Sequence, residues 1–316
     1  MPGARGGLPL TRHREDGGGW PRTMLVGEAG PVSTRQEFRE FRQVDVFSAE
    51  PHLGNPVAVV HDADGMTGEE MARFARWTNL SETTFLLPPT TAEADYRLRI
   101  FTPAEELPFA GHPTLGSAHA WLDAGGVPGR EGELVQECGA GQVRVRSRGR
   151  LAFEAPPLVR SGRVTAEQRR AVVAALRLSP EQVLDVEWVD NGPGWVGVLV
   201  PDAATVLGLR PDWSAFAGLE VGVVGRYPGA DVGAGEPLVE VRAFCPSLGV
   251  VEDPVTGSLN ASLAQWLTRN GTLPPAYVAS QGTCLGRQGR VHIETEGRSI
   301  WVGGETRTIV AGTVVV

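Results

Sequence analysis

Three short segments recur in the same order in the two halves of this 316-residue chain, and this repetition limits the possible folds more than any other feature. In each half an apolar strand follows a turn of Gly, Asn and Pro, a second strand ends at a proline, and a helix then carries a Trp-Leu pair. Such repetition favours an internal duplication, with chance similarity of short apolar strands as the alternative. The matched segments are 54–63 with 191–203, 99–103 with 242–246, and the predicted helix starts Gly116-Ser117 with Gly257-Ser258.

A duplicated chain of this kind predicts an α+β fold with two pseudo-symmetric halves. We expect a curled mixed β-sheet around one central helix in each half, with the active site in the cleft between them, where both helix N-termini meet. Residues 1–40 are rich in Gly, Arg and Pro and are interpreted as a flexible extension. We place the first half at 41–157 and the second at 158–316, with the last strand free to return to the first half.

Local patterns place a candidate catalytic carboxylate. Thr67 to Trp77 repeats apolar residues at helical spacing, with Thr67 as N-cap and an end near Asn79. The apolar run that follows predicts a strand with Glu82 at its mouth. A carboxylate among apolar neighbours is partly desolvated, which raises its pKa toward the range useful to a general acid or base. A solvated surface carboxylate is the alternative.

The stretch from Pro108 to Leu122 puts a Gly-His-Pro turn at the start of an apolar helix. The first N–H groups of a helix are unpaired and carry the positive end of its dipole, so anions bind there readily. Asp253 leads the second helix start, so a small carboxylated molecule would lie between the His112 imidazole and the Asp253 carboxylate. Each residue also has a structural interpretation: His112 as a turn histidine, Asp253 as an N-cap and Ser258 as a first-turn serine.

Composition and missing motifs narrow the classes of function. A net charge of -8 without clustered cations argues against nucleic acid. No apolar run approaches the ~18 residues of a membrane span, and the amino terminus lacks the apolar core of a secretory signal, so we expect a cytoplasmic protein. The three widely spaced cysteines indicate reduced thiols that act as small buried apolar residues.

Cofactor sites are not expected. The chain lacks the phosphate-loop, zinc-protease and nucleophile-elbow motifs, and it has no complete dinucleotide fingerprint. His112 and His119 have no further ligand at metal-binding spacing, so no metal is predicted. These observations leave a small molecule as the expected partner.

Six motifs follow one another along the chain: Gly54-Asn55-Pro56, 79–83, 108–114, 252–258, Gln281-Gly282 with Gly286-Arg287, and 302–304. Together they resemble the phenazine-biosynthesis isomerase (PhzF-like) family. The resemblance implies a fold similar to diaminopimelate epimerase, usually a homodimer, and no cofactor. In that epimerase the helix starts carry two catalytic cysteines, whereas Ala110 and Asp253 stand at or near those places here. A two-thiol racemase is therefore disfavoured.

The resemblance also implies roles for individual residues. The family's proton-carrying glutamate matches Glu82, and its histidine, aspartate and serine match His112, Asp253 and Ser258. The remaining substrate-binding residues are implied to be Asn55, in the first motif, and the backbone amides near Gly111 and Gly257.

These observations favour a cofactor-independent isomerase that acts on a small unsaturated carboxylated substrate, either amino-acid-like or dihydro-hydroxyanthranilate-like. Glu82 would move a proton within the substrate, while His112 and Asp253 orient its polar groups. Fixed N–H dipoles at the helix starts would stabilise the charge that develops. An amino-acid epimerase or racemase, or a catalytically inactive small-molecule binding protein of the same fold, is the alternative.

Overall fold

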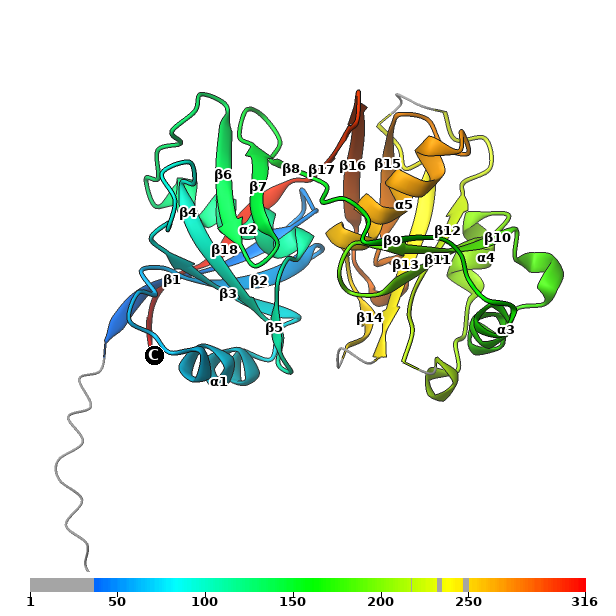
Figure 1. Cartoon of the computed structure of the whole chain (residues 1–316), viewed down its shortest axis with the longest axis horizontal. Helices are drawn as coiled ribbons and strands as arrows, with labels where there is room; N and C mark the ends of the chain where they lie inside the picture. Colours follow the sequence, from blue (N-terminus) through cyan, green and yellow to red (C-terminus); the bar gives the residue numbers. More distant parts are fainter. Residues whose placement is uncertain (1–36, 217, 232–234, 247–249) are drawn as a thin grey trace, which may run out of the picture. The chain divides into compact units, whose positions relative to one another are not determined.

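The computed structural model describes residues 37–216, 218–231, 235–246 and 250–316. Glu37–Val316 form one compact unit, whose helices and strands are labelled in Figure 1. The predicted extension lies outside the described residues up to position 36. Its last residues, 38–40, belong to the first strand instead, because the ladder between the first and last strands reaches Phe38 opposite Val315.

The first half packs its strands around one long buried helix, α2. Its helices are α1 (Gly68–Thr78) and α2 (Gly111–Asp123). As predicted, Thr67 caps α1 through a capping box, and Asn79 ends it in the left-handed conformation. The strands are β1 (Phe38–Val46), β2 (Asn55–Val60), β3 (Glu82–Leu87), β4 (Tyr96–Phe101), β5 (Glu106–Leu107), β6 (Glu133–Cys138), β7 (Gly141–Arg146) and β8 (Ala152–Glu154), together with β18 (Thr306–Val315).

The second half is built in the same way around α5. Its helices are α3 (Ala166–Ala175), α4 (Ala203–Gly208) and α5 (Gly257–Arg269), with short 3-10 turns η1 (Pro180–Gln182), η2 (Trp213–Ala215) and η4 (Thr283–Leu285). The strands are β9 (Arg160–Arg163), β10 (Asp185–Asp190), β11 (Trp195–Leu199), β12 (Glu220–Arg226), β13 (Val239–Cys245), β14 (Val250–Asp253), β15 (Ala276–Gln281), β16 (Gly289–Glu296) and β17 (Ser299–Gly303).

The two halves repeat one strand topology, which confirms the predicted pseudo-symmetry. A helix connects two parallel strands in each half: α1 joins β2 to β3, and α4 joins β11 to β12. An antiparallel strand follows, and the central helix then leads to a strand parallel to it. The registers match as well, because Val57 pairs with Glu82 and Trp195 pairs with Glu220. Glu82 and Glu220 are therefore equivalent, each the first residue of its strand.

Among the described strands, one pair joins the sheets of the two halves. Within the halves, β9 pairs with β10, and the last strand, β18, returns to pair antiparallel with β1. β8 of the first half also pairs with β17 of the second. The two predicted sheets are thus parts of one 18-stranded sheet, and Figure 1 shows β8 and β17 where the two groups of strands meet.

Most residues of the two central helices are buried. α2 contacts β1, β2, β3 and β18, and α5 contacts β10, β16 and β17, so that one hydrophobic core runs through both halves. Gly116 lets α2 approach the sheet, because a Cβ there would lie 2.3 Å from Val57 Cγ1. The predicted helix start at Gly116-Ser117 is wrong: this pair lies in the middle of α2, and Gly111 is the residue equivalent to Gly257.

Among the described residues, no helix combines the length and the apolar character that a membrane span needs.

Candidate active site

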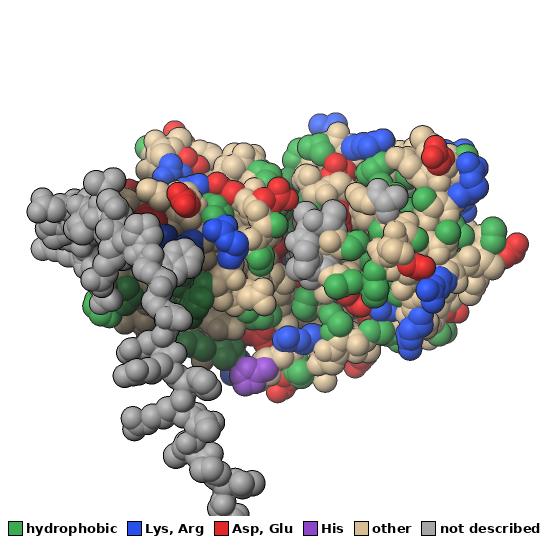
Figure 2. Space-filling model, turned by 90° about the horizontal axis from the view of Figure 1, so that it is seen from below, with side chains coloured by type: hydrophobic (Ala, Val, Ile, Leu, Met, Phe, Trp, Pro, Cys, Tyr) green, Lys and Arg blue, Asp and Glu red, His purple; other side chains and the backbone are tan. Residues whose placement is uncertain are grey.

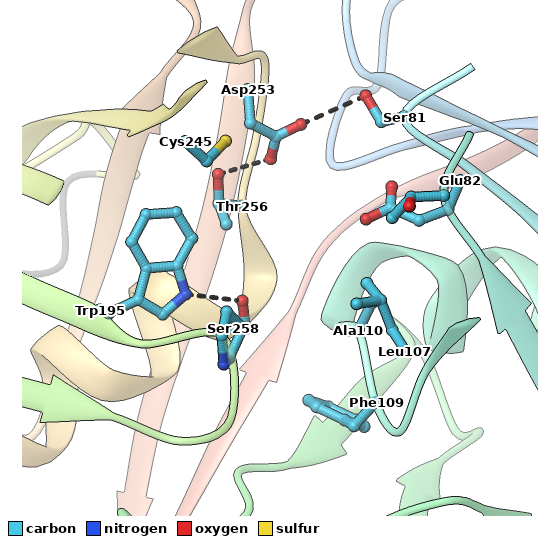
Figure 3. Close-up of a pocket in the computed structure, with 12 residues that line it drawn as sticks. Ser81, Glu82, Leu107, Phe109, Ala110, Trp195, Cys245, Asp253, Thr256 and Ser258 are labelled. Carbon is cyan, nitrogen blue, oxygen red and sulfur yellow. Dashed lines mark hydrogen bonds between the residues drawn. The ribbon is translucent and has the colours of Figure 1, made fainter. Parts of the chain in front are cut away.

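A cavity lies where the start of α2 faces the start of α5 (Figure 3). The space inside it that admits a water-sized molecule is about 40 Å³. The first half supplies one wall and the second half the other. The lining residues are Ser81, Glu82, Thr102, Leu107, Phe109 and Ala110 from the first half, and Pro193, Trp195, Cys245, Asp253, Thr256 and Ser258 from the second.

The two central helices begin in direct contact. A Cβ on Gly111 would lie 2.8 Å from Gly257 Cα, and a Cβ on Gly257 would lie 2.9 Å from Gly111 Cα, so only glycine fits at either place. The N-cap residues Ala110 and Thr256 make no capping hydrogen bond with their side chains. Two positive helix ends, with N–H groups that no N-cap side chain satisfies, therefore converge beside the cavity.

Glu82 stands at the mouth of β3, as the sequence predicts, and Figure 3 shows its carboxyl group facing the cavity. Its side chain is 14% exposed, and its Oε2 lies 3.4 Å from His112 Nε2. Neither of these two atoms has a hydrogen-bond partner among the residues that the structure describes. Burial, with a further contribution from the charge of Asp253, raises the pKa of Glu82 well above its ordinary value.

His112 lies behind the cavity wall rather than in it. Its side chain is 3% exposed, and burial lowers the pKa of the ring to about 3, against a hydrogen bond to the Pro56 carbonyl. The Asn55 amide nitrogen lies 3.2 Å from His112 Nδ1 and donates to the Val255 carbonyl at 3.0 Å. His112 is therefore a neutral ring held in place, and it offers no positive charge to an anion.

Asp253 ends β14 and is the better-bonded carboxylate of the site. Its Oδ1 accepts from Asn55 Nδ2 at 3.0 Å and from Ser81 Oγ at 3.4 Å, and its Oδ2 accepts from Thr256 Oγ1 at 2.5 Å. Burial raises the pKa of Asp253, while these three hydrogen bonds act in the opposite direction. The interpretation of Asp253 as an N-cap is wrong, because Thr256 occupies that position.

Ser258, in the first turn of α5, lines the cavity with its hydroxyl group held by a tryptophan. Trp195 Nε1 donates to Ser258 Oγ at 3.2 Å, and Asn191 Nδ2 donates to the Ser258 carbonyl at 3.0 Å. Figure 3 shows Trp195 and Ser258 on the wall opposite Phe109 and Ala110. The structure therefore brings Glu82, Asp253 and Ser258 to the cavity, places His112 and Asn55 behind them, and packs Gly111 against Gly257.

Sequence reasoning missed several lining residues, of which Trp195 and Cys245 are the most informative. Cys245 occupies the position in the second half that Thr102 occupies in the first, and both line the cavity. The repeat of 99–103 in 242–246 was the available signal. Burial and the nearby carboxylates raise the pKa of Cys245 well above its ordinary value, so it is a neutral thiol. The prediction that all three cysteines are buried is wrong, because Cys284 is exposed.

The cavity contains acids and no cation among its described lining residues. The chain has no lysine at all, and arginine is its only strongly basic residue. An anionic group of a ligand would therefore be held by backbone N–H groups and hydroxyls rather than by a positively charged side chain. Away from the site, Figure 2 shows basic and acidic side chains interspersed on the face that it displays.

This fold and this site define a class of proteins. Residues 44–316 match the family described as phenazine biosynthesis-like protein, and the chain belongs to that family. It is 37% identical over 269 residues to the trans-2,3-dihydro-3-hydroxyanthranilate isomerase of Pseudomonas aeruginosa, covering 80% of this chain and 89% of the relative.

Two further comparisons agree with this assignment. The chain is 37% identical over 290 residues to a Schizosaccharomyces pombe protein named antisense-enhancing sequence 1, covering 86% of this chain and 97% of that protein. The crystal structure of a PhzF-family protein from Enterococcus faecalis superposes with a TM-score of 0.71 at 25% identity, over 89% of this chain and 100% of that one. The chain is thus a member of a family that contains isomerases, and its fold is the one expected from the motifs.

Proposed function

We propose that this protein is a cofactor-independent isomerase in which Glu82 moves a proton from one carbon to another of a small unsaturated carboxylated substrate. The observation that carries the proposal is the position of the Glu82 carboxyl group and its lack of a hydrogen-bond donor among the described residues. Its carboxyl group faces the cavity, is nearly buried, and has an oxygen to which no described residue donates a hydrogen bond. A carboxyl group without competing partners is free to exchange its proton with a ligand.

The surroundings of Glu82 suit proton transfer. Burial raises the pKa of Glu82 well above its ordinary value, which makes this carboxyl group a stronger proton acceptor than an exposed one. His112 Nε2 lies 3.4 Å from the Glu82 carboxyl group, and because the ring is neutral it adds no charge there. The nearly buried position of Glu82 slows exchange of its proton with bulk water during turnover.

The N–H groups at the starts of α2 and α5 favour a substrate that has a carboxylate group. The uncapped N–H groups near Gly111 and Gly257 offer donors to a carboxylate, and Ser258 adds a hydroxyl group. Asp253 is placed to accept from a donor such as a substrate amino or hydroxyl group. These features suit an amino-acid-like molecule, and the named Pseudomonas aeruginosa relative suggests one similar to dihydro-hydroxyanthranilate. By the same resemblance we propose a homodimer that works in the cytoplasm without a cofactor.

Reaction in deuterated water tests the proposal. The purified protein is incubated with a panel of unsaturated cyclic and acyclic amino acids, including trans-2,3-dihydro-3-hydroxyanthranilate, and products are followed by proton NMR and mass spectrometry. We expect a shifted double bond with deuterium at one carbon in part of the product. Label at a stereocentre without a double-bond shift would indicate an epimerase instead. Binding without any product across the panel would contradict the proposal and favour a binding protein.

A further inference from the structure

Gln281 lies outside the cavity but contacts the segment that carries Asp253. It is the last residue of β15 and is completely buried. Its Nε2 donates to Thr256 Oγ1 at 2.8 Å and to the Asp253 backbone carbonyl at 3.1 Å. Its Oε1 accepts from the Thr256 backbone N–H at 3.0 Å and from Asn260 Nδ2 at 2.8 Å. All of these hydrogen bonds go to residues 253–260.

This arrangement allows only one orientation of the Gln281 amide. A backbone N–H group donates and never accepts, so the oxygen of the amide must face Thr256 N. The nitrogen therefore faces Thr256 Oγ1 and donates to it. Since this lone pair of the hydroxyl group is occupied, the hydroxyl hydrogen of Thr256 is directed to its other close partner, Asp253 Oδ2, at 2.5 Å.

The consequence concerns two buried carboxyl groups in one cavity. Two such groups close together do not both ionise readily, so the better-bonded one keeps the charge and the other keeps the proton. Asp253 receives hydrogen bonds from Asn55, Ser81 and Thr256. Glu82 Oε2 receives none from the described residues.

We propose that the Gln281–Thr256 pair keeps Asp253 ionised and thereby leaves the shared proton on Glu82. Both are positioning residues: Thr256 donates directly to Asp253, and Gln281 acts through Thr256. The inference deepens the proposed function, because it assigns the protons of the same site, and it rests on that function only for its role in turnover. Since Glu82 starts with the proton, it gives this proton to one substrate carbon and then takes a proton from another carbon, which restores its protonated state.

The segment from Gln281 to Arg287 also holds the turn before Asn55, the residue of the first half that donates a hydrogen bond to Asp253. Arg287 donates to the His52 and Gly54 carbonyls at 3.0 and 3.1 Å, directly before Asn55. The turn between Gln281 and Arg287 needs glycine at Gly282, where φ is +89° and a Cβ would lie 2.6 Å from the Pro254 carbonyl oxygen. One short stretch of the second half therefore aligns both Asp253 and the amide that donates to it.

Other titratable groups also face the pair. His112 on α2 is neutral, and Cys245 on β13 is a protonated thiol. Glu252 on β14 forms a two-point ion pair with Arg242 at 2.8 Å for each contact, and Glu220 on β12 adds to the negative potential at Cys245. None of these groups differs between the variants below, so they do not account for a difference among them.

Carbon-13 NMR of protein labelled at the Asp and Glu carboxyl carbons measures the protonation of each group directly, without substrate. Signals are assigned with Glu82→Gln and Asp253→Asn. In the unaltered protein we expect Glu82 to titrate at the higher pH. In Thr256→Val the Asp253 midpoint rises by about one pH unit or more, because a hydrogen bond to a charged group is lost, and the Glu82 midpoint falls. Thr256→Ser retains the hydroxyl group, so in this variant Glu82 should again titrate at a higher pH than Asp253.

Gln281→Met should have the same effect as Thr256→Val: the Asp253 midpoint rises and the Glu82 midpoint falls. In the double variant with Thr256→Val, the Asp253 midpoint should rise no further than in Thr256→Val alone. Gln136→Met is the matched control, because Gln136 is equally buried on β6 and donates to Thr114 Oγ1 at 3.0 Å, but contacts no carboxylate of the site. The control should lower thermal stability and leave both midpoints unchanged.

Unchanged midpoints in Thr256→Val, or an equal shift in Gln136→Met, would overturn the inference. If Gln281→Met does not fold, the Thr256→Val and Thr256→Ser pair decides. Because no substrate is present, a failed isomerase assay leaves the titration result standing, and a failed titration leaves the assay result standing.

Discussion

The starts of α2 and α5 occupy matching places in the two halves but carry opposite chemistry. At α2 the N-cap is Ala110, which has no hydroxyl group, and the nearby Glu82 has an oxygen without a hydrogen-bond partner among the described residues. At α5 the N-cap is Thr256, whose hydroxyl group holds Asp253. A symmetric backbone thus supports an asymmetric pair of carboxyl groups, one free to exchange a proton and one fixed.

The largest effect is expected from a change in Glu82, the carboxyl group of the pair that exchanges a proton. Glu82→Gln keeps the shape of the side chain and removes its proton exchange, so turnover in the deuterium assay should fall by roughly 10²- to 10⁴-fold. The equivalent glutamate, Glu220, is buried but is not among the described lining residues, so Glu220→Gln is the matched control and should retain activity. Comparable losses in both variants would refute the assignment of proton transfer to Glu82.

The second prediction concerns the close contact between the starts of α2 and α5. Gly111→Ala places a methyl group within 2.8 Å of the Gly257 backbone, so the helices must move apart. Overpacking of this kind should lower the free energy of unfolding by about 3 kcal/mol. Gly208→Ala, where a Cβ meets nothing within 4 Å, should leave that free energy nearly unchanged. Urea denaturation measures both, and equal stabilities of the two variants would contradict the close approach.

The third prediction uses the pH dependence of stability. The folded-state pKa of Glu82 is raised, so its contribution is complete below the unfolded-state pKa of about 4.3 and is lost as pH rises toward the folded-state pKa. Glu82→Gln lacks this loss. At neutral pH the variant should therefore be more stable than the unaltered protein by about 1–2 kcal/mol, and the difference should shrink toward pH 4. A difference that is constant with pH would show that Glu82 is not desolvated.

The smallest effect concerns the fixed side of the site. Trp195→Phe removes the hydrogen bond to Ser258 Oγ and should weaken binding of a substrate or product about 3- to 10-fold, measured by calorimetry. Trp188→Phe is the control in the same half, because Trp188 Nε1 has no hydrogen-bond partner among the described residues. Equal affinities in the two variants would show that the hydrogen bond from Trp195 to Ser258 does not contribute to binding.

Much of the fold follows from local patterns. The helix capped by Thr67, the strand that begins at Glu82 and the duplication of strands all depend on periodicity and turn residues, which act over short distances. The error at Gly116-Ser117 has the same origin, because a repeated pair of residues does not show where a helix begins. The start of β1 at Phe38 depends on pairing with Val315, which no local pattern contains.

The sequence by itself determined the duplicated α+β architecture, the position of Glu82 at a strand mouth, and the helix start at Gly257, because these rest on neighbouring residues. Only the tertiary structure decided which carboxyl group is free and which is fixed. That difference depends on burial and on partners far apart in the chain, such as Asn55 and Asp253, which are separated by 198 positions. Hydrogen bonds of this range exist only after the two halves have closed around the cavity.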